Sequence, residues 1–331
     1  MGTVGSITAP VIQDWSDGRV RKVLPLVLTG LFALSACRLA EHDDPADEAG
    51  RLNTMAAFPL HAYVPDPASD GANAVSSAQW ILGKQCMVRL GFAGFAVLDT
   101  KAVESTYPVR QGMLPHEGTF GDDSPYGVVD PDLASEHGYH NRKPDASAQP
   151  QEWPADQYAA LTGSFESGDS RFAHGHRIPE GGCLGEAMRK IYGPPPKVTK
   201  VNGIKLTGYY SLAFELWYES HKKATKDPAW KKADRAWSAC MKKKGFSYSD
   251  PDKASIDSHW FGHRKPSDKE KETATADARC KLDTGYVPAV HALEVHIQKS
   301  LIGKNKEKLD TLRSTDERAV RKARTITGHA K

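Results

Sequence analysis

The stretch Cys240-Met241-Lys242-Lys243-Lys244-Gly245-Phe246 is followed by Asp250-Pro251-Asp252-Lys253-Ala254-Ser255 and then by His263-Arg264-Lys265-Pro266. The same order occurs earlier in the chain, as Cys86-Met87-Val88-Arg89-Leu90-Gly91-Phe92, Asp130-Pro131-Asp132-Leu133-Ala134-Ser135 and Asn141-Arg142-Lys143-Pro144. Each copy is closed by a further cysteine, Cys183 in the first and Cys280 in the second. The sequence therefore predicts two diverged modules with two cysteines each.

Both repeated motifs are typical of helix ends. In Cys-Met-x-x-x-Gly-Phe the glycine can adopt the left-handed conformation that ends a helix, and the aromatic residue can pack back on the last turn. In Asp-Pro-Asp-x-Ala-Ser the first aspartate can cap a helix, and proline suits its first position. Neither motif contains a nucleophile or a base, so both predict structure rather than chemistry.

The N-terminal region has the pattern of an export signal. A basic segment with Arg19, Arg21 and Lys22 precedes an apolar run at 23–33, which is too short to span a bilayer. The run leads to Leu34-Ser35-Ala36-Cys37, which resembles a bacterial lipobox. We expect residues 1–37 to be a lipoprotein signal, with lipidation of Cys37 holding the protein on the outer face of the cytoplasmic membrane. The alternative is an ordinary signal peptide with a nearby cysteine.

The remaining cysteines indicate disulfides. The chain has five cysteines, and without Cys37 the number is even, as expected for an exported protein. These cysteines allow three pairings, of which the repeat favours Cys86 with Cys183 and Cys240 with Cys280.

The predicted fold is mainly α with long irregular loops, built as two disulfide-bridged helical modules. We expect an acidic, solvated tether at 38–57, module one at 58–196 and module two at 197–331, with the proline run at 194–196 as the boundary. A long amphipathic C-terminal helix should begin near Pro288, and its basic part at 318–324 should protrude or fray.

Several cysteine contexts resemble a known family. They are Trp237-Ser238-Ala239-Cys240-Met241 with Gly245-Phe246, the segment Gly181-Gly182-Cys183-Leu184-Gly185-Glu186-Ala187, and Ala276-Asp277-Ala278-Arg279-Cys280-Lys281 leading to His291-x-x-Glu294. Together they resemble uncharacterised actinobacterial, Streptomyces-like secreted lipoproteins. The resemblance covers nearly the whole mature chain and implies export, lipidation and the disulfides. It supplies no catalytic residue, and similar proteins occur beside envelope transporter components.

Histidines form three clusters that could hold a metal. Neutral imidazoles close together are common ligands of zinc and copper. The spacings are loose, however, and no His-Glu-x-x-His motif occurs, so the competing interpretation is solvated histidines in loops and turns. The candidate metal ligands are His137, His140, His174, His176, His259 and His263.

Basic residues crowd one predicted helical hairpin, with Trp230 and Trp237 among them. Outside the cell such a surface could contact anionic lipid headgroups, wall polymers or a membrane protein complex. The competing interpretation is a solvated helix face whose tryptophans belong to the core. A formal net charge of +3 argues against a nucleic-acid-binding protein. The candidate contact residues are Lys222, Lys223, Lys231, Lys232, Lys242, Lys243 and Lys244.

Common catalytic motifs are absent from the sequence. There is no Gly-x-Ser-x-Gly, Walker A or Gly-x-Gly-x-x-Gly motif, and Ser220-x-x-Lys223 lacks the partner motifs of penicillin-interacting enzymes. We therefore expect a non-enzymatic, lipid-anchored surface protein without a cofactor. The alternative is a metal-binding protein or metal-dependent enzyme that uses the histidine clusters.

Overall fold

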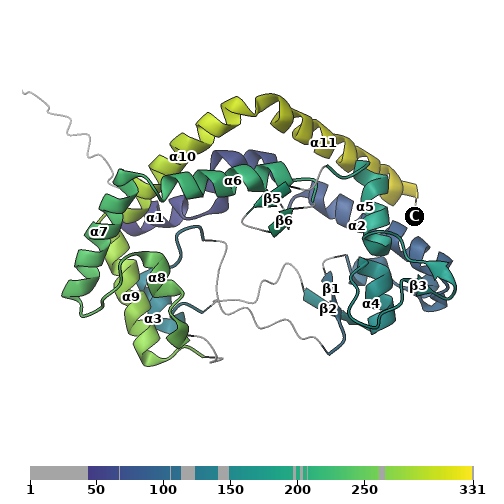
Figure 1. The fold of residues 1–331 in the computed structure, drawn as a ribbon, viewed down its shortest axis with the longest axis horizontal. Helices are drawn as coiled ribbons and strands as arrows, with labels where there is room; N and C mark the ends of the chain where they lie inside the picture. The colour runs from purple at the N-terminus through teal and green to yellow at the C-terminus, as the bar shows by residue number, and fades with distance from the viewer. Residues whose placement is uncertain are drawn as a thin grey trace, which may run out of the picture. The chain divides into compact units, whose positions relative to one another are not determined.

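The described part of the chain is mainly helical (Figure 1), as the sequence predicts. The computed structural model describes residues 44–66, 68–104, 106–112, 124–140, 149–196, 199–201, 204–206, 208–260 and 265–329. The helices are α1 Pro45–Leu52, α2 Asp70–Arg89, α3 Pro131–His137, α4 Ala155–Thr162, α5 Gly182–Tyr192, α6 Ser211–Ala224, α7 Pro228–Lys243, α8 Pro251–Ser255, α9 Asp268–Asp283, α10 Tyr286–Lys304 and α11 Lys306–His329. The strands form short pairs: β1 Thr106–Arg110 is parallel to β2 Gln149–Trp153, β3 Phe172–Ala173 is antiparallel to β4 His176–Arg177, and β5 Thr199–Val201 is antiparallel to β6 Ile204–Leu206.

The repeated motifs form the helix ends predicted for them. Gly91 and Gly245, just after α2 and α7, have φ of +93° and +91°. The N–H groups of Phe92 and Phe246 donate to the carbonyls of Met87 and Met241, five residues earlier in each case. This is the hydrogen bond that satisfies carbonyls at a glycine-terminated helix end. At the other motif, the side chains of Asp130 and Asp250 cap α3 and α8.

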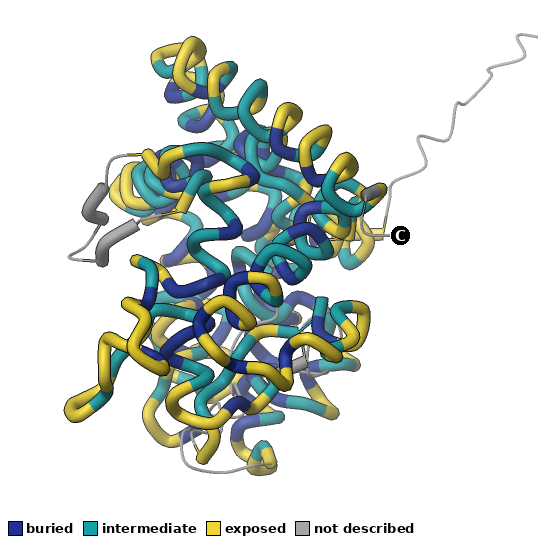
Figure 2. Tube along the Cα trace, turned by 90° about the vertical axis from the view of Figure 1, so that its right-hand side faces the viewer, coloured by how far each residue is buried: buried dark blue, intermediate teal, exposed yellow. Residues whose placement is uncertain are grey.

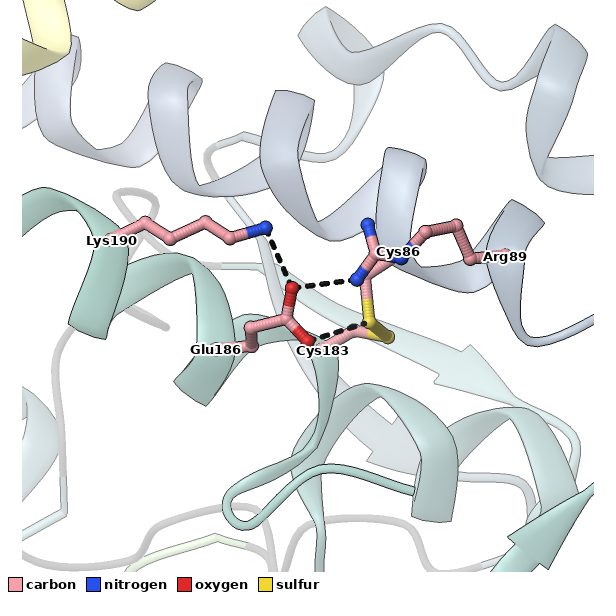
Figure 3. The surroundings of a disulfide bond; sticks show 5 residues. All are labelled: Cys86, Arg89, Cys183, Glu186 and Lys190. Atoms are coloured by element: carbon pink, nitrogen blue, oxygen red, sulfur yellow. Dashed lines mark hydrogen bonds and ion pairs between the residues drawn. A yellow bond between two sulfur atoms is a disulfide. The ribbon is translucent and has the colours of Figure 1, made fainter. Parts of the chain in front are cut away.

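The predicted disulfides are confirmed. Cys86–Cys183 joins α2 to α5, and Cys240–Cys280 joins α7 to α9. Around the first bond, Arg89 and Lys190 reach one oxygen of Glu186 at 2.6 Å and 2.7 Å, and the other oxygen lies beside the Cys86 sulfur (Figure 3). Although burial acts to raise it, these two cations lower the pKa of Glu186. The bridges indicate an oxidising, extracytoplasmic environment.

The cores do not divide at the proline run, in contrast to the predicted module boundary. The described residues between Asp44 and His329 form one compact unit. The largest core, on α7, α9 and α10, includes Tyr126, Ala134 and Tyr139 from the sequence assigned to module one. The reason is that α3 packs on α9 rather than on the helices of its own module. The bridged helices α2 and α5 share a separate core with α4.

The C-terminal region is helical over the length predicted, but its basic last part does not protrude or fray as predicted. The helical region is long but breaks at Asn305, between α10 and α11. The basic end does not protrude, because α11 packs along α2 and α5 there (Figure 1). Ala319 and Ala323, one turn apart, belong to this contact and are 1% and 0% exposed. Small side chains let α11 approach closely while its basic residues stay in solvent, and Figure 2 shows this division between buried and exposed sides along the helices.

The acidic segment expected to be a solvated tether is folded where the structure describes it, from Asp44 onward. Residues 45–52 form α1, which is capped by Asp44 and contacts α9 and α10. Ala49 is 2% exposed, and the Asn53 side chain bonds the backbone of Tyr126 and Gly127. The acidic residues of α1 lie in its first turn, where the helix dipole favours them, so a low apolar content did not exclude order.

A buried ion pair joins the parts of the largest core. The Lys281 ammonium, 2% exposed, donates to the carbonyls of Tyr126 and Val128 at 2.8 Å and 3.0 Å and to Asp277 at 3.0 Å. Asp277 also accepts from the Trp237 indole at 2.9 Å. Burial raises the pKa of Asp277 in spite of the neighbouring ammonium.

We predict that Lys281→Met lowers the free energy of unfolding by about 3–5 kcal/mol, because it leaves a buried carboxylate without its cation. Urea denaturation measures this difference. The matched control is Lys269→Met on the exposed side of α9, which should change stability by less than about 0.5 kcal/mol. In the double variant Lys281→Met, Asp277→Leu, much of the loss should be recovered. A cost below about 1 kcal/mol for Lys281→Met would contradict this account.

Candidate functional site

The helical hairpin of α6 and α7 separates its apolar and basic residues. On α7, Trp230, Asp234, Trp237 and Met241 are buried. Their spacing of i, i+4, i+7 and i+11 defines one side of a helix. The Trp237 indole bonds Asp277, and Trp230 packs against Tyr126 and Tyr286. Both tryptophans therefore belong to the core, as the second interpretation of this segment expected.

The other side of α7 presents its cations to solvent. Lys231, Arg235 and Lys242 lie nearly above one another, and Lys232 and Lys243 lie beside them, within a sector of roughly 120° at about 100° per residue. At about 1.5 Å per residue the sector, from Lys231 to Lys243, is roughly 18 Å long. The only carboxylate of α7, Asp234, is 4% exposed and bonds the Tyr286 hydroxyl and Lys231. We call the exposed cations of this hairpin the basic face: Lys222, Lys223, Lys226, Lys231, Lys232, Arg235, Lys242, Lys243 and Lys244.

Few of these cations are neutralised within the chain. Lys223 pairs with Glu219 at 2.5 Å, Lys231 with Asp234 at 3.1 Å, and Lys244 lies 4.0 Å from Asp283. In the described part of the chain the other members of the basic face make no ion pair. They are Lys222, Lys226, Lys232, Arg235, Lys242 and Lys243. Their charge is therefore available to an outside anion.

A groove of about 660 Å³ continues the basic face beyond the end of α7. Lys244 from that end and Lys271 and Arg279 from α9 line it, together with the acidic Asp268 and Glu272. The Cys240–Cys280 bond, with a Cα–Cα distance of 5.6 Å, holds α9 beside the last turns of α7. The remaining lining residues are Ser135, Phe246, Thr275 and Ala276.

The five candidate histidines that the structure describes are not gathered into one cluster. Among the described residues no group of three or more histidine, cysteine, aspartate or glutamate side chains could hold a metal ion. His137 faces Glu136, His140 bonds Glu270 at 2.7 Å, and His259 bonds Asp257 at 2.6 Å.

The remaining histidines also differ in their surroundings. His174 bonds the Leu90 carbonyl at 2.9 Å and packs its ring edge-to-face against Phe92. His176 is exposed on β4. His263 and Cys37 lie outside the described residues.

Behind the basic face lies a polar network that the sequence did not predict. Glu294 on α10 is buried and accepts from Tyr126, Ser220 and His221, each at 3.3 Å. Gln298, one turn later, donates to the Ser220 hydroxyl. The Ser220 hydroxyl therefore belongs to this network. Polar residues one turn apart on a mostly apolar helix were the available signal.

Comparisons with known proteins identify no relative. No family model matches the chain, and neither the curated proteins nor the solved structures give a significant match. The predicted lipoprotein resemblance therefore stays a prediction. No helix in the described part of the chain has the length and apolar character needed to cross a membrane.

His221 gives this region a pH dependence. The hydrogen bond to Glu294 raises the pKa of His221 above its ordinary value of 6.5, although burial opposes the shift, and the charges of Glu294 and Asp252 add to it. A raised folded-state pKa stabilises the protein below the unfolded pKa, and this contribution is lost as pH rises through the folded-state value. We predict that wild type exceeds His221→Gln in unfolding free energy at about pH 5, and that the difference shrinks by about pH 8. Urea denaturation across this range checks it, and a difference that grows with pH would contradict the assignment.

Proposed function

We propose that this chain is a lipid-anchored extracytoplasmic protein that binds a phosphate-bearing anionic component of the cell envelope through the basic face. The observation that carries the proposal is the sector of exposed cations along α7, in which Lys232, Arg235, Lys242 and Lys243 make no ion pair within the described residues. An anionic surface attracts each nearby Lys or Arg with about 1 kcal/mol, so several aligned cations give substantial binding without a pocket. The attraction is screened over roughly 8 Å at physiological ionic strength.

Two further observations support this function. The disulfides indicate export, which places the basic face where lipid headgroups and wall polymers are the abundant anions. The α7 surface is also rigid, because α7 is tied to α9 by a disulfide and by the Trp237 bond to Asp277. Cations on a rigid helix lose little conformational freedom of the backbone on binding.

Lipidation is tested by removing the cysteine that would carry the lipid and measuring where the protein is found. If Cys37 carries lipid, then Cys37→Ser should move the protein from the membrane fraction to the culture medium, because acyl chains supply the stable membrane attachment. Fractionation followed by mass spectrometry of the N-terminal peptide measures this. A wild-type protein that is found unacylated in the medium would exclude the anchor.

Binding by the basic face is tested on the full chain with Cys37→Ser, so that lipid does not dominate. We expect binding to phosphatidylglycerol-containing vesicles or to purified teichoic acid that weakens steeply with salt. Lys242→Gln with Lys243→Gln should weaken it by roughly 30-fold, at about 1 kcal/mol for each charge.

The control removes the same charge elsewhere. Lys299→Gln with Lys322→Gln changes exposed lysines of α10 and α11 and should leave affinity within about threefold. Binding to vesicles but not to the polymer identifies the lipid surface as the partner, and the reverse identifies the wall. Equal losses in both double variants, or no binding to either probe at low salt, would overturn the proposal.

A further inference from the structure

A second cavity lies where the end of α5, the start of α6 and the first half of α11 meet. It has a volume of about 280 Å³ and shares no described lining residue with the basic face. This volume is at the small end of the range for ligand pockets, roughly 300–1,000 Å³, so it suits one ring or two rather than a long chain. Its described lining consists of Tyr192, Pro194, Pro196, Tyr209, Tyr210, Ser211, Leu212, Glu215, Lys308, Thr311, Leu312 and Thr315.

The tyrosine rings of this cavity are fixed by their own hydroxyl groups. Tyr192 and Tyr209 stack with their centroids 4.5 Å apart, and Tyr209 donates to the Gly193 carbonyl at 2.6 Å. Tyr192 and Tyr210 both donate to Asp316, and their hydroxyl oxygens lie 2.6 Å from each other. Burial raises the pKa of Tyr192 and Tyr210, which keeps both hydroxyls protonated. The rings are thus held in place before any ligand arrives, which reduces the entropy lost on binding.

The polar groups around these rings offer both hydrogen-bond donors and acceptors. Glu215 from α6 and Lys308 from α11 line the cavity, and neither makes an ion pair within the described residues. The hydroxyls of Thr311 and Thr315 donate to backbone carbonyls of α11 and therefore retain lone pairs that can accept. A ligand here meets aromatic rings together with one free carboxylate and one free ammonium.

We propose that this cavity binds a pyranose ring of a neutral or N-acetylated glycan. The C–H groups of a pyranose carry partial positive charge and are attracted to the negative faces of aromatic rings. Its hydroxyls can donate to Glu215 and accept from Lys308, so one ligand can hydrogen-bond both charged groups. A purely apolar ligand would desolvate these groups without replacing their hydrogen bonds, and a simple cation or anion would pair with only one of the two charges. The proposal does not depend on the function of the basic face.

The test is a titration of the full chain with N-acetylglucosamine oligomers and, separately, with maltotriose. Saturation-transfer NMR detects which ring protons contact the protein, and calorimetry gives the affinity. We expect Tyr209→Ala to weaken binding by about tenfold and Tyr209→Phe, which keeps the ring, by less than about threefold. Glu215→Gln should weaken it as well. The matched control is Tyr107→Ala, which removes an exposed tyrosine of β1 and should leave the affinity unchanged.

Three outcomes would overturn the glycan site. One is the absence of saccharide binding at millimolar concentration. Another is binding that neither Tyr209→Ala nor Glu215→Gln changes. The third is binding of glycine betaine in place of saccharides, which would assign the cavity to a zwitterion. If Tyr209→Ala lowers thermal stability, the affinity of Glu215→Gln, a substitution at a half-buried residue of α6, still tests the site.

Discussion

The buried ammonium of Lys281 is the interaction on which the arrangement of the larger core depends. Burying a charge costs several kcal/mol unless all its hydrogen bonds are made, and here two of them come from the backbone at Tyr126 and Val128. That segment must therefore pass over α9 at one place. Asp277 accepts the third hydrogen bond of the Lys281 ammonium and also accepts from the Trp237 indole. These hydrogen bonds together position α7, α9 and the loop before α3. Apolar packing alone would tolerate several paths for this loop, because it has no directional requirement.

This constraint explains why the folded unit does not follow the repeat in the sequence. Once the loop passes over α9, α3 follows it, and Tyr139 stacks on Trp260 at 6.1 Å while its N–H bonds Glu270. Helix ends and cysteine pairs were predictable, because glycine, aspartate and proline act through their local conformation and an even cysteine count limits the pairings. The partner of α3 was not predictable, because its Asp-Pro-Asp motif specifies where a helix begins and says nothing about which helix covers it.

The same reasoning applies to the sites. The outward direction of Lys232, Lys242 and Lys243 follows from the helical period once Trp230 and Trp237 are assigned to the core, so the basic face could be predicted. The tyrosine cavity could not, because Tyr192, Tyr210 and Asp316 come from α5, from the turn before α6 and from α11, which are distant in the sequence. The cavity forms only because α11 packs on α5 through its alanines, so that residues of α11 complete the cavity wall. The sequence instead predicts that this part of the chain protrudes or frays.

The two proposed sites have different physical ranges, and this difference would give each a distinct role. The basic face acts over about a Debye length, attracts any dense anion and discriminates little between anions. The cavity acts only at contact, with rings already fixed, and its free Glu215 and Lys308 penalise a ligand that cannot satisfy both. The basic face would hold the protein against the envelope without selecting a particular anion. The cavity would then select one ligand within the envelope. A chain with both needs no catalytic group to recognise a glycan that lies close to an anionic surface.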